Sequence, residues 1–303
     1  MENSESDVVY LRTLGIRPEL IDAILDPQYE AVRATETVDY WVQDSVRDRW
    51  ETLAAARDNV TAALQKLVDK RGRPRKREKN PRHDPRSQST EHDDTAQIIP
   101  IVDSINQITS ADAMHTRFFK GGRIGRFLTA RPTVSTEPLE MMGLASYPPQ
   151  DFSSWSRGLY LTKSRACALQ FAKYAAGRNN DDAYGVLVLD IPSHLLGDHH
   201  FVVGDDWQQL IRACKGRYKS NARAINLSES YAGYPIPVGP ISAKGNDVIS
   251  RNEEVAISIM ELDGDKPHQW VIQSRTLMAE IGELCREKCW IEDVTALVTK
   301  ENS

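Results

Sequence analysis

A short strand followed at once by a helix, within residues 151–175, constrains the fold of this chain most. A polar, serine-rich stretch passes through Gly158 into Leu159–Thr162, whose apolar and aromatic side chains predict a strand. Ser164 is a preferred N-cap residue, and an apolar face at helical spacing follows at Ala168, Phe171, Ala172 and Ala175. The ring of Tyr160 and the free N–H groups at the helix start suit a nucleotide or dinucleotide. An ordinary strand–turn–helix core unit has the same pattern, so both interpretations stay open here.

Length and composition indicate a globular protein. The 303 residues are enough for one large domain or two ordinary ones, and 40% are hydrophobic and 27% charged. No apolar run approaches the roughly 18 residues of a membrane span. The acidic N-terminus also lacks the apolar core of a signal peptide. We therefore expect an intracellular protein, in the nucleus or the cytoplasm, without a membrane partner.

The cysteines form no metal-binding pattern. They are Cys167, Cys214, Cys285 and Cys289. The last two are four residues apart on an expected helix, but two thiols do not make a zinc site. We expect reduced, packed cysteines and no bound metal.

Residues 1–69 are expected to be helical. Pro18 suits a first helical turn, and the Asp26-Pro27 pair ends that short helix. A longer helix follows, whose one-sided apolar stripe consists of Val38, Val42, Val46, Trp50, Leu53, Val60, Leu64 and Leu67. We interpret the stripe as the face that packs on the helix's own domain. A partner helix or a coiled coil is the alternative.

Residues 70–96 are expected to be a disordered basic linker, because they offer no aromatic or β-branched apolar side chain to bury. Between Lys70 and Arg86 lie nine Lys/Arg and two acids, a charge of +7 in a chain whose net charge is −5. Its core resembles an AT-hook, whose arginines enter the minor groove of A·T-rich DNA. The candidate nucleic-acid contacts are Lys70, Arg71, Arg73, Arg75, Lys76 and Arg77. RNA attraction, nuclear import and an inert linker remain alternatives.

Residues 97–303 have a mixed pattern that predicts an α+β domain. The expected strands are Arg117–Lys120, stopped by Gly121-Gly122, then Tyr184–Asp190, Tyr234–Pro240, Val255–Met260 and Trp270–Ile272. The prolines of Tyr234–Pro240 predict an edge or a border. The expected helices are Asp205–Cys214 and Arg275–Trp290, and Ile98–Ile108 is a helix or an extended entry segment.

Four pieces of the chain, in this order, resemble the ADP-ribosyltransferase fold. Its first core strand is similar to Arg117–Gly122, its second motif to Gly158–Ser164 and the next strand to Tyr184–Pro192. The closing pattern is similar to Tyr234–Ile241 followed by His268–Ser274. The nearest variant is a group of uncharacterised ADP-ribosyltransferase-like domains of bacteria and fungi. The resemblance covers roughly residues 115–284 and implies a split β-sheet core behind the N-terminal helical region.

The family's chemistry implies a role for each matching position. Lys120, followed by Gly121, stands where the family has a His or Arg that holds a ribose or phosphate of NAD. Tyr160 matches the aromatic residue that stacks on nicotinamide, and small hydroxyl residues follow at Thr162 and Ser164.

The third catalytic position is ambiguous. The family usually has a glutamate there, because a carboxylate stabilises the positive charge that develops on the sugar. Glu254 or its neighbour Glu253 is one candidate, and Gln269 is the substitute in another alignment. An amide brings no charge, so catalysis would then be weaker or of another kind.

The expected function is therefore NAD binding, with transfer of ADP-ribose or cleavage of NAD. One alternative is a catalytically inactive, nucleic-acid-associated regulator that residues 70–86 direct to DNA or RNA. The other is an enzyme of different chemistry that acts on a charged or tRNA-linked substrate in a specialised pathway.

Overall fold

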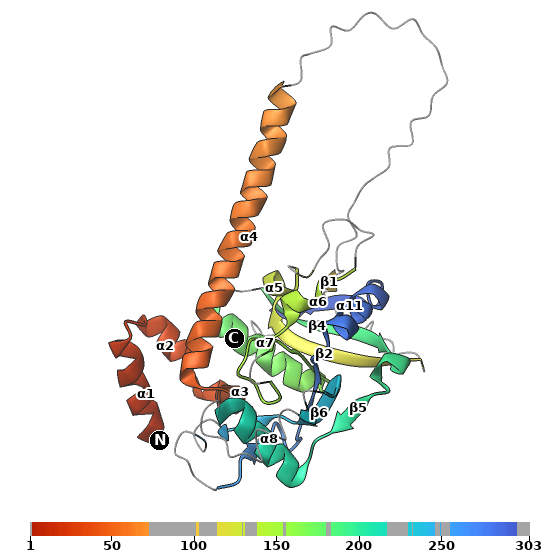
Figure 1. Ribbon diagram of the computed structural model, residues 1–303. Coiled ribbons are helices and arrows are strands. Elements are labelled where there is room, and N and C mark those ends of the chain that lie inside the picture. The colour runs from red at the N-terminus through yellow and green to blue at the C-terminus, as the bar shows by residue number, and fades with distance from the viewer. Residues whose placement is uncertain are drawn as a thin grey trace, which may run out of the picture.

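The computed structural model describes most of the chain outside the basic tract. The described residues are 2–72, 101–102, 114–128, 130, 138–153, 156–179, 183–216, 230–231, 233–245, 249 and 255–295. They form a mixed α+β structure in which helices cover an eight-stranded sheet, and a long helix projects from the body (Figure 1). The α+β class expected from the sequence is confirmed.

The main sheet has the strand order β1-β10-β4-β2-β3-β9-β6-β5. In chain order these strands are β1 (Ile101–Val102), β2 (His115–Arg123), β3 (Leu159–Thr162), β4 (Tyr184–Pro192), β5 (His199–Phe201), β6 (Ile236–Pro240), β9 (His268–Ile272) and β10 (Cys289–Asp293). The outermost pairs, β1 with β10 and β5 with β6, are parallel, and the inner pairs are antiparallel. A separate two-stranded sheet joins β7 (Ser242–Ala243) to β8 (Ser258–Ile259).

The sheet divides between its two central strands. Over the described residues, β2 and β3 share a single register pair, Phe119 with Thr162. On the outer sides, β2 pairs with β4 along its whole length and β3 pairs with β9 along its whole length. Beyond Phe119 the two halves therefore separate, and space opens between the end of β2 and the start of β3.

Helices cover both faces of the half that contains β2 and β4. On one face, α7 (Arg165–Asn179) packs its alanines against Val186 and Val188. The other face packs against α5 (Ile124–Leu128), α6 (Met141–Leu144) and α11 (Arg275–Leu284) through Leu187 and Leu189. Every residue of β4 is buried, as its apolar and β-branched sequence predicts for a strand covered on both faces.

The predicted end of the first core strand at Gly121-Gly122 is wrong, because β2 runs through both glycines to Arg123. A Cβ on Gly121 would lie 1.7 Å from the backbone oxygen of Ala168. The glycine therefore lets α7 approach the strand closely, and it does not end the strand.

The N-terminal helices pack on α7. They are α1 (Glu2–Thr13), α2 (Pro18–Ile24), a 3₁₀ turn (Pro27–Tyr29), α3 (Glu30–Arg33) and α4 (Val38–Gly72). Tyr174 of α7 lies against the rings of Tyr29 and Trp41, and its hydroxyl donates to the Ile24 carbonyl at 3.0 Å. The side chains of α7 thus join the N-terminal helices to the sheet.

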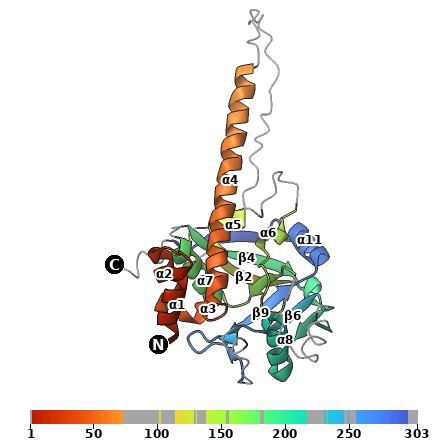
Figure 2. The same ribbon diagram turned by 60° about the vertical axis from the view of Figure 1, so that its left-hand side comes forward.

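Most of the apolar stripe on α4 does not pack on the body, contrary to the prediction. Val38 and Val42 contact the core at its lower end, but the remaining side chains of the stripe, from Val46 to Leu67, are more than half exposed. Figures 1 and 2 show the helix leaving the body and standing free along its upper part. The helix also continues through residues 70–72, which were expected to belong to the linker.

Three other expected elements differ in the structure. The final helix ends at Leu284, and Cys289–Asp293 forms β10, because Cys289, Trp290 and Ile291 pair with the buried strand β4. The proline-containing strand β6 lies inside the sheet, where β5 covers its other edge. Within Val255–Met260, only Ser258–Ile259 is a strand.

Candidate functional site

A pocket lies where the sheet divides. Its empty volume, which includes open solvent at the mouth, is about 990 Å³. From the core it is lined by residues of β2, β3, α7 and β9, and from the N-terminal region by Thr35, Glu36, Tyr40, Trp41, Asp44 and Asp48. The N-terminal helical region and the α+β domain, which the sequence analysis separates, therefore line one pocket together.

Five of the predicted site residues line this pocket: Lys120, Gly121, Tyr160, Thr162 and Gln269. Ser164 is not among the lining residues, because its hydroxyl caps α7 by accepting from the Cys167 amide at 3.2 Å. Glu253 and Glu254 lie outside the described residues. Lys70 and Arg71 are in the last turn of α4, and Arg73, Arg75, Lys76 and Arg77 also lie outside the described part of the chain.

Lys120 reaches across the division of the sheet. Its Nζ donates to the backbone oxygen of Tyr160 at 3.4 Å, at a point where β2 and β3 no longer pair. Burial lowers the pKa of Lys120 to about 7; the positive charge of Arg126 adds to this effect, while Asp44 and Asp48 oppose it. The amine is therefore poised to gain a proton when an anion enters the pocket.

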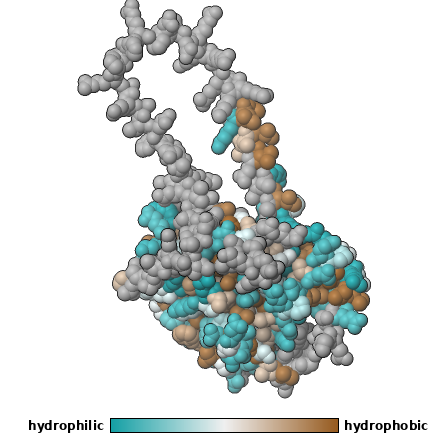
Figure 3. Space-filling model, turned by 180° about the vertical axis from the view of Figure 1, so that it is seen from behind, coloured by the Kyte–Doolittle hydropathy of each residue, from teal (hydrophilic) through white to brown (hydrophobic). Residues whose placement is uncertain are grey.

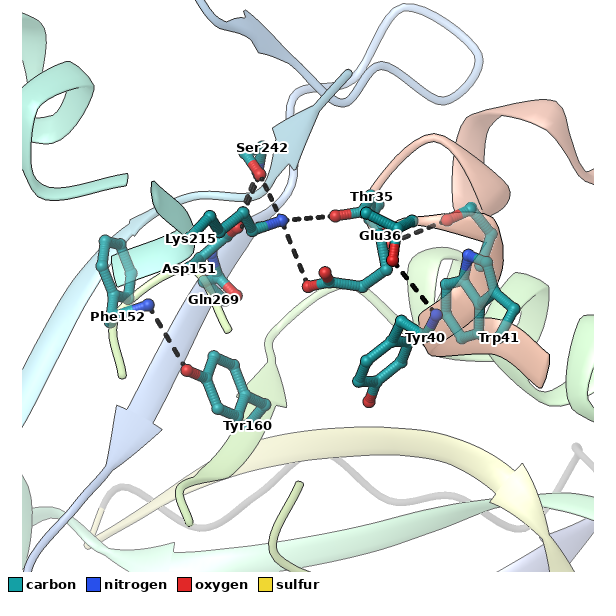
Figure 4. Close-up of polar contacts among 12 residues, drawn as sticks. Thr35, Glu36, Tyr40, Trp41, Asp151, Phe152, Tyr160, Lys215, Ser242 and Gln269 are labelled. Carbon is teal, nitrogen blue, oxygen red and sulfur yellow. Dashed lines mark hydrogen bonds and ion pairs between the residues drawn. The ribbon is translucent and has the colours of Figure 1, made fainter. Parts of the chain in front are cut away.

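Tyr160 is held at both ends. Its strand fixes the backbone, and its hydroxyl accepts from the Phe152 amide at 3.4 Å. Burial raises the pKa of the hydroxyl well above its usual value, so the ring stays neutral. The ring of Tyr40 lines the same pocket, and Figure 4 shows the two rings apart from one another with space between them.

Gln269 is oriented by its neighbours. Its Nε2 donates to Asp151 Oδ2 at 2.6 Å and to the Pro240 carbonyl at 3.2 Å. Both amide hydrogens are thereby used, so Oε1 is the atom with which this side chain can contact a ligand, as an acceptor.

Behind Gln269 lies a buried ion cluster centred on Lys215 of α8 (Gly204–Gly216). Its Nζ is 2.8 Å from Asp151 Oδ1 and 3.1 Å from Glu36 Oε1, and the Lys215 side chain is wholly buried (Figure 4). Burial opposes the charge of Lys215, but the two carboxylates raise its pKa. One ammonium therefore lies between two carboxylates beside the pocket.

Asp151 has hydrogen-bond partners besides Lys215 and Gln269. It also accepts from the Ser242 hydroxyl at 2.5 Å and from the Ser242 amide at 2.8 Å. Glu36 comes from the connection between α3 and α4, and Lys215 also donates to the carbonyl of the adjacent Thr35. The ion cluster therefore fixes the N-terminal connection onto the core next to Gln269.

A second charged group lines the side of the pocket nearest α4. Asp44 is 3.0 Å from Arg178 and 3.8 Å from Arg126, and Asp48 is 3.6 Å from Arg126. Burial opposes ionisation of Asp44, but the two arginines lower its pKa. Burial and the charge of Asp44 raise the pKa of Asp48 to about 6. In this part of the pocket, two arginines thus lie next to two carboxylates, and α4 supplies both carboxylates.

Gln150 has a side-chain donor in the pocket that no protein atom satisfies. Gln150 is buried and lines the pocket, and its Nε2 has no hydrogen-bond partner. A buried amide donor without an acceptor is costly. An acceptor atom of a ligand would satisfy it.

The sequence analysis missed the carboxylates of this site. Glu36, Asp44 and Asp48 belong to the N-terminal region, where the apolar stripe predicted that a different face of the long helix meets the core. A weak indication was available, since Asp44 and Asp48 are four residues apart and share a face of α4 that differs from the apolar stripe.

Three further predictions concern the cysteines, of which Cys167 lines the pocket, metal ions and membrane spans. All four cysteines are free and buried, in agreement with the expected packed thiols. Within the described residues, no His, Cys, Asp or Glu side chains group together in a way that could hold a metal ion. Among the helices that the structure describes, none has the length and apolar character to cross a membrane.

No family model, curated protein or solved structure matches this chain.

Proposed function

We propose that the pocket binds NAD or a closely related nucleotide and that the protein acts on its glycosidic bond in the manner of an ADP-ribosyltransferase. The supporting observation is the convergence of Lys120, Tyr160 and Gln269, which span about half of the sequence, on one pocket. In the family that the sequence resembles, the matching positions hold the same ligand. The specific ADP-ribosyltransferase fold is part of this proposal.

The residues fit the parts of such a ligand. The neutral ring of Tyr160, in a pocket that Tyr40 also lines, suits stacking on a flat base or on nicotinamide. The Gln269 oxygen can accept from a ribose hydroxyl, and Gln150 Nε2 can donate to the ligand. Lys120 supplies a positive charge for a phosphate, although a lysine cannot make the two parallel bonds of an arginine.

Glu36 is the carboxylate that we assign to the chemical step. Breaking the bond between nicotinamide and ribose leaves positive charge on the sugar, and a nearby negative charge stabilises that transition state. Glu36 lines the pocket, and Asp151 shares with it the one ammonium of Lys215. The Glu36 carboxylate thus takes the place of the charge that Gln269 lacks.

Release of nicotinamide from NAD tests this assignment. We expect the full chain to release nicotinamide, and Glu36→Gln to lower kcat by about 10²–10³, the usual effect of removing one stabilising group. Asp205→Asn, on an exposed part of α8, is the matched control and should leave the rate unchanged. Equal rates for the parent and Glu36→Gln would contradict the role of Glu36.

One observation favours a second candidate, an inactive nucleotide-binding regulator. Gln269 brings no charge, and Asp151 and Pro240 fix its amide group. Under this alternative the parent protein binds NAD but releases no nicotinamide, and residues 70–86 direct it to nucleic acid. Deletion of residues 70–86 separates the two functions, because it would abolish nucleic-acid retention and leave any NAD turnover intact. Turnover of a tRNA-linked or other charged substrate in place of NAD would favour the third interpretation, an enzyme of different chemistry.

A further inference from the structure

The exposed side chains of α4 follow a strict heptad pattern. Positions 46, 50, 53, 57, 60, 64 and 67 alternate in spacings of four and three, and all are apolar except Arg57. The exposed fractions are 57% for Val46, 70% for Trp50, 66% for Leu53, 59% for Val60, 57% for Leu64 and 56% for Leu67. A period of 3.5 residues is that of a coiled-coil seam, because it keeps one stripe facing a partner helix as both helices supercoil.

This heptad stripe differs from the face of α4 that packs on the body. Ser45 and Asp48 are buried against the core, whereas Val46 is exposed beside them. The stripe begins beside the body and continues up the free part of the helix, where Figure 3 shows apolar side chains gathered. A helix that projects into water gains most of its stability by burying such a face.

We propose that the heptad stripe is the interface of an antiparallel homodimer, in which α4 of a second copy of this chain covers it. The stripe complements itself in this orientation. If residue 57 lies beside residue 60 of the second copy, then Trp50 lies beside its Leu67 and Leu53 beside its Leu64. Each layer of the seam then contains two side chains from different heptad positions, as antiparallel packing requires.

Arg57 decides the orientation. A parallel pair would place the two Arg57 side chains in one layer, where like charges repel. In the antiparallel pair each Arg57 packs its aliphatic stem against Val60 of the second copy and keeps its guanidinium in water. The antiparallel pair also places the two bodies at opposite ends of the seam.

The exposed apolar area of the stripe reaches the size of a small specific interface. At about 25 cal/mol per Å², a buried valine or leucine corresponds to roughly 60–120 Å², and a tryptophan buries about 150–250 Å². The heptad stripe and its neighbour Val68, 61% exposed, therefore offer roughly 600–1,200 Å² over two copies. A specific interface needs about 1,000 Å² in total, and the small flanking side chains Ala54 and Ala63 let the helices approach closely.

The mass of the full chain in solution, measured by light scattering over a wide range of concentration, tests the proposal. We expect a particle of twice the 34.1 kDa of one chain. The double variant Leu53→Glu, Leu64→Glu should raise the dissociation constant of the dimer at least about 100-fold, because it buries four carboxylates in the seam. Val203→Glu, equally exposed on the body, is the control and should remain dimeric.

Disulfide formation tests the orientation. A mixture of Leu53→Cys and Leu64→Cys chains should form the mixed disulfide, and Leu53→Cys alone should not couple to itself. A monomeric mass at every concentration would overturn the proposal, and the heptad stripe would then be a binding surface for another protein. The proposal would also be overturned if the double glutamate variant dimerised as tightly as the parent, or if Leu53→Cys chains formed a disulfide with one another.

Discussion

Lys120 is the side chain whose charge state matters most for a nucleotide in the pocket. Its pKa is lowered to about 7, from a usual value of 10.5, so the folded protein disfavours the charged form. The unfolded chain therefore binds more protons between pH 7 and pH 10.5, and this group makes folding more favourable as pH rises through that window. An anionic ligand acts in the opposite direction, because it favours the charged form.

We expect the affinity for NAD to be highest below pH 7 and to fall as the pH rises from 7 to 9, because Lys120 loses its proton over that range. Lys120→Arg, which keeps its charge, should remove most of this pH dependence. Titration calorimetry at several pH values measures both. An affinity that is independent of pH in the parent would show that Lys120 does not face the anionic part of the ligand.

Substitution of Lys215 tests how much the buried ion cluster stabilises the protein. Lys215→Met should destabilise the protein by about 3–5 kcal/mol, because it leaves Asp151 and Glu36 buried without their counter-charge. Lys244→Ala removes an exposed pair with Glu30, 3.7 Å apart, and should cost at most about 1 kcal/mol. Urea unfolding of both variants makes the comparison, and equal losses would contradict the structural role of the ion cluster.

The contact between β2 and α7 depends on one glycine. Gly121→Ala should cost about 3 kcal/mol, because its Cβ would meet the backbone of Ala168 and the helix would have to move. Gly177→Ala, in α7 itself, meets no atom within 4 Å and should stabilise the helix by about 0.5–1 kcal/mol. Thermal unfolding measures both changes. A Gly121→Ala variant as stable as the parent would mean that the strand and helix pack less closely than described.

Elements with a strong local pattern were predictable from the sequence. The strand Tyr184–Asp190, the Ser164 cap and the helix Asp205–Cys214 all follow from side-chain type and spacing. The strand β10 was not predictable, since its residues continue the helical pattern of α11 and become a strand only by pairing with β4. The position of β6 inside the sheet likewise depends on β5, a three-residue strand that has no pattern of its own.

The site was predictable only in part, because it combines distant regions of the chain. Lys120, Tyr160 and Gln269 belong to core strands whose order the resemblance implies, and the pocket contains all three. Glu36 and Asp44 reach the same pocket because Tyr174 and Arg178 of α7 hold the N-terminal helices against the core. Such a contact between separate helices leaves no periodic trace in the sequence.

The most direct test of the proposed function is calorimetric titration of the full chain with NAD. We predict saturable binding of one NAD per chain. Tyr160→Ala should lower the affinity for NAD by about 10- to 100-fold, because it removes one stacked ring. Tyr234→Ala removes a ring outside the pocket lining and should leave the affinity unchanged. Absence of binding, or equal affinity in the parent and Tyr160→Ala, would contradict the assignment of the pocket to NAD.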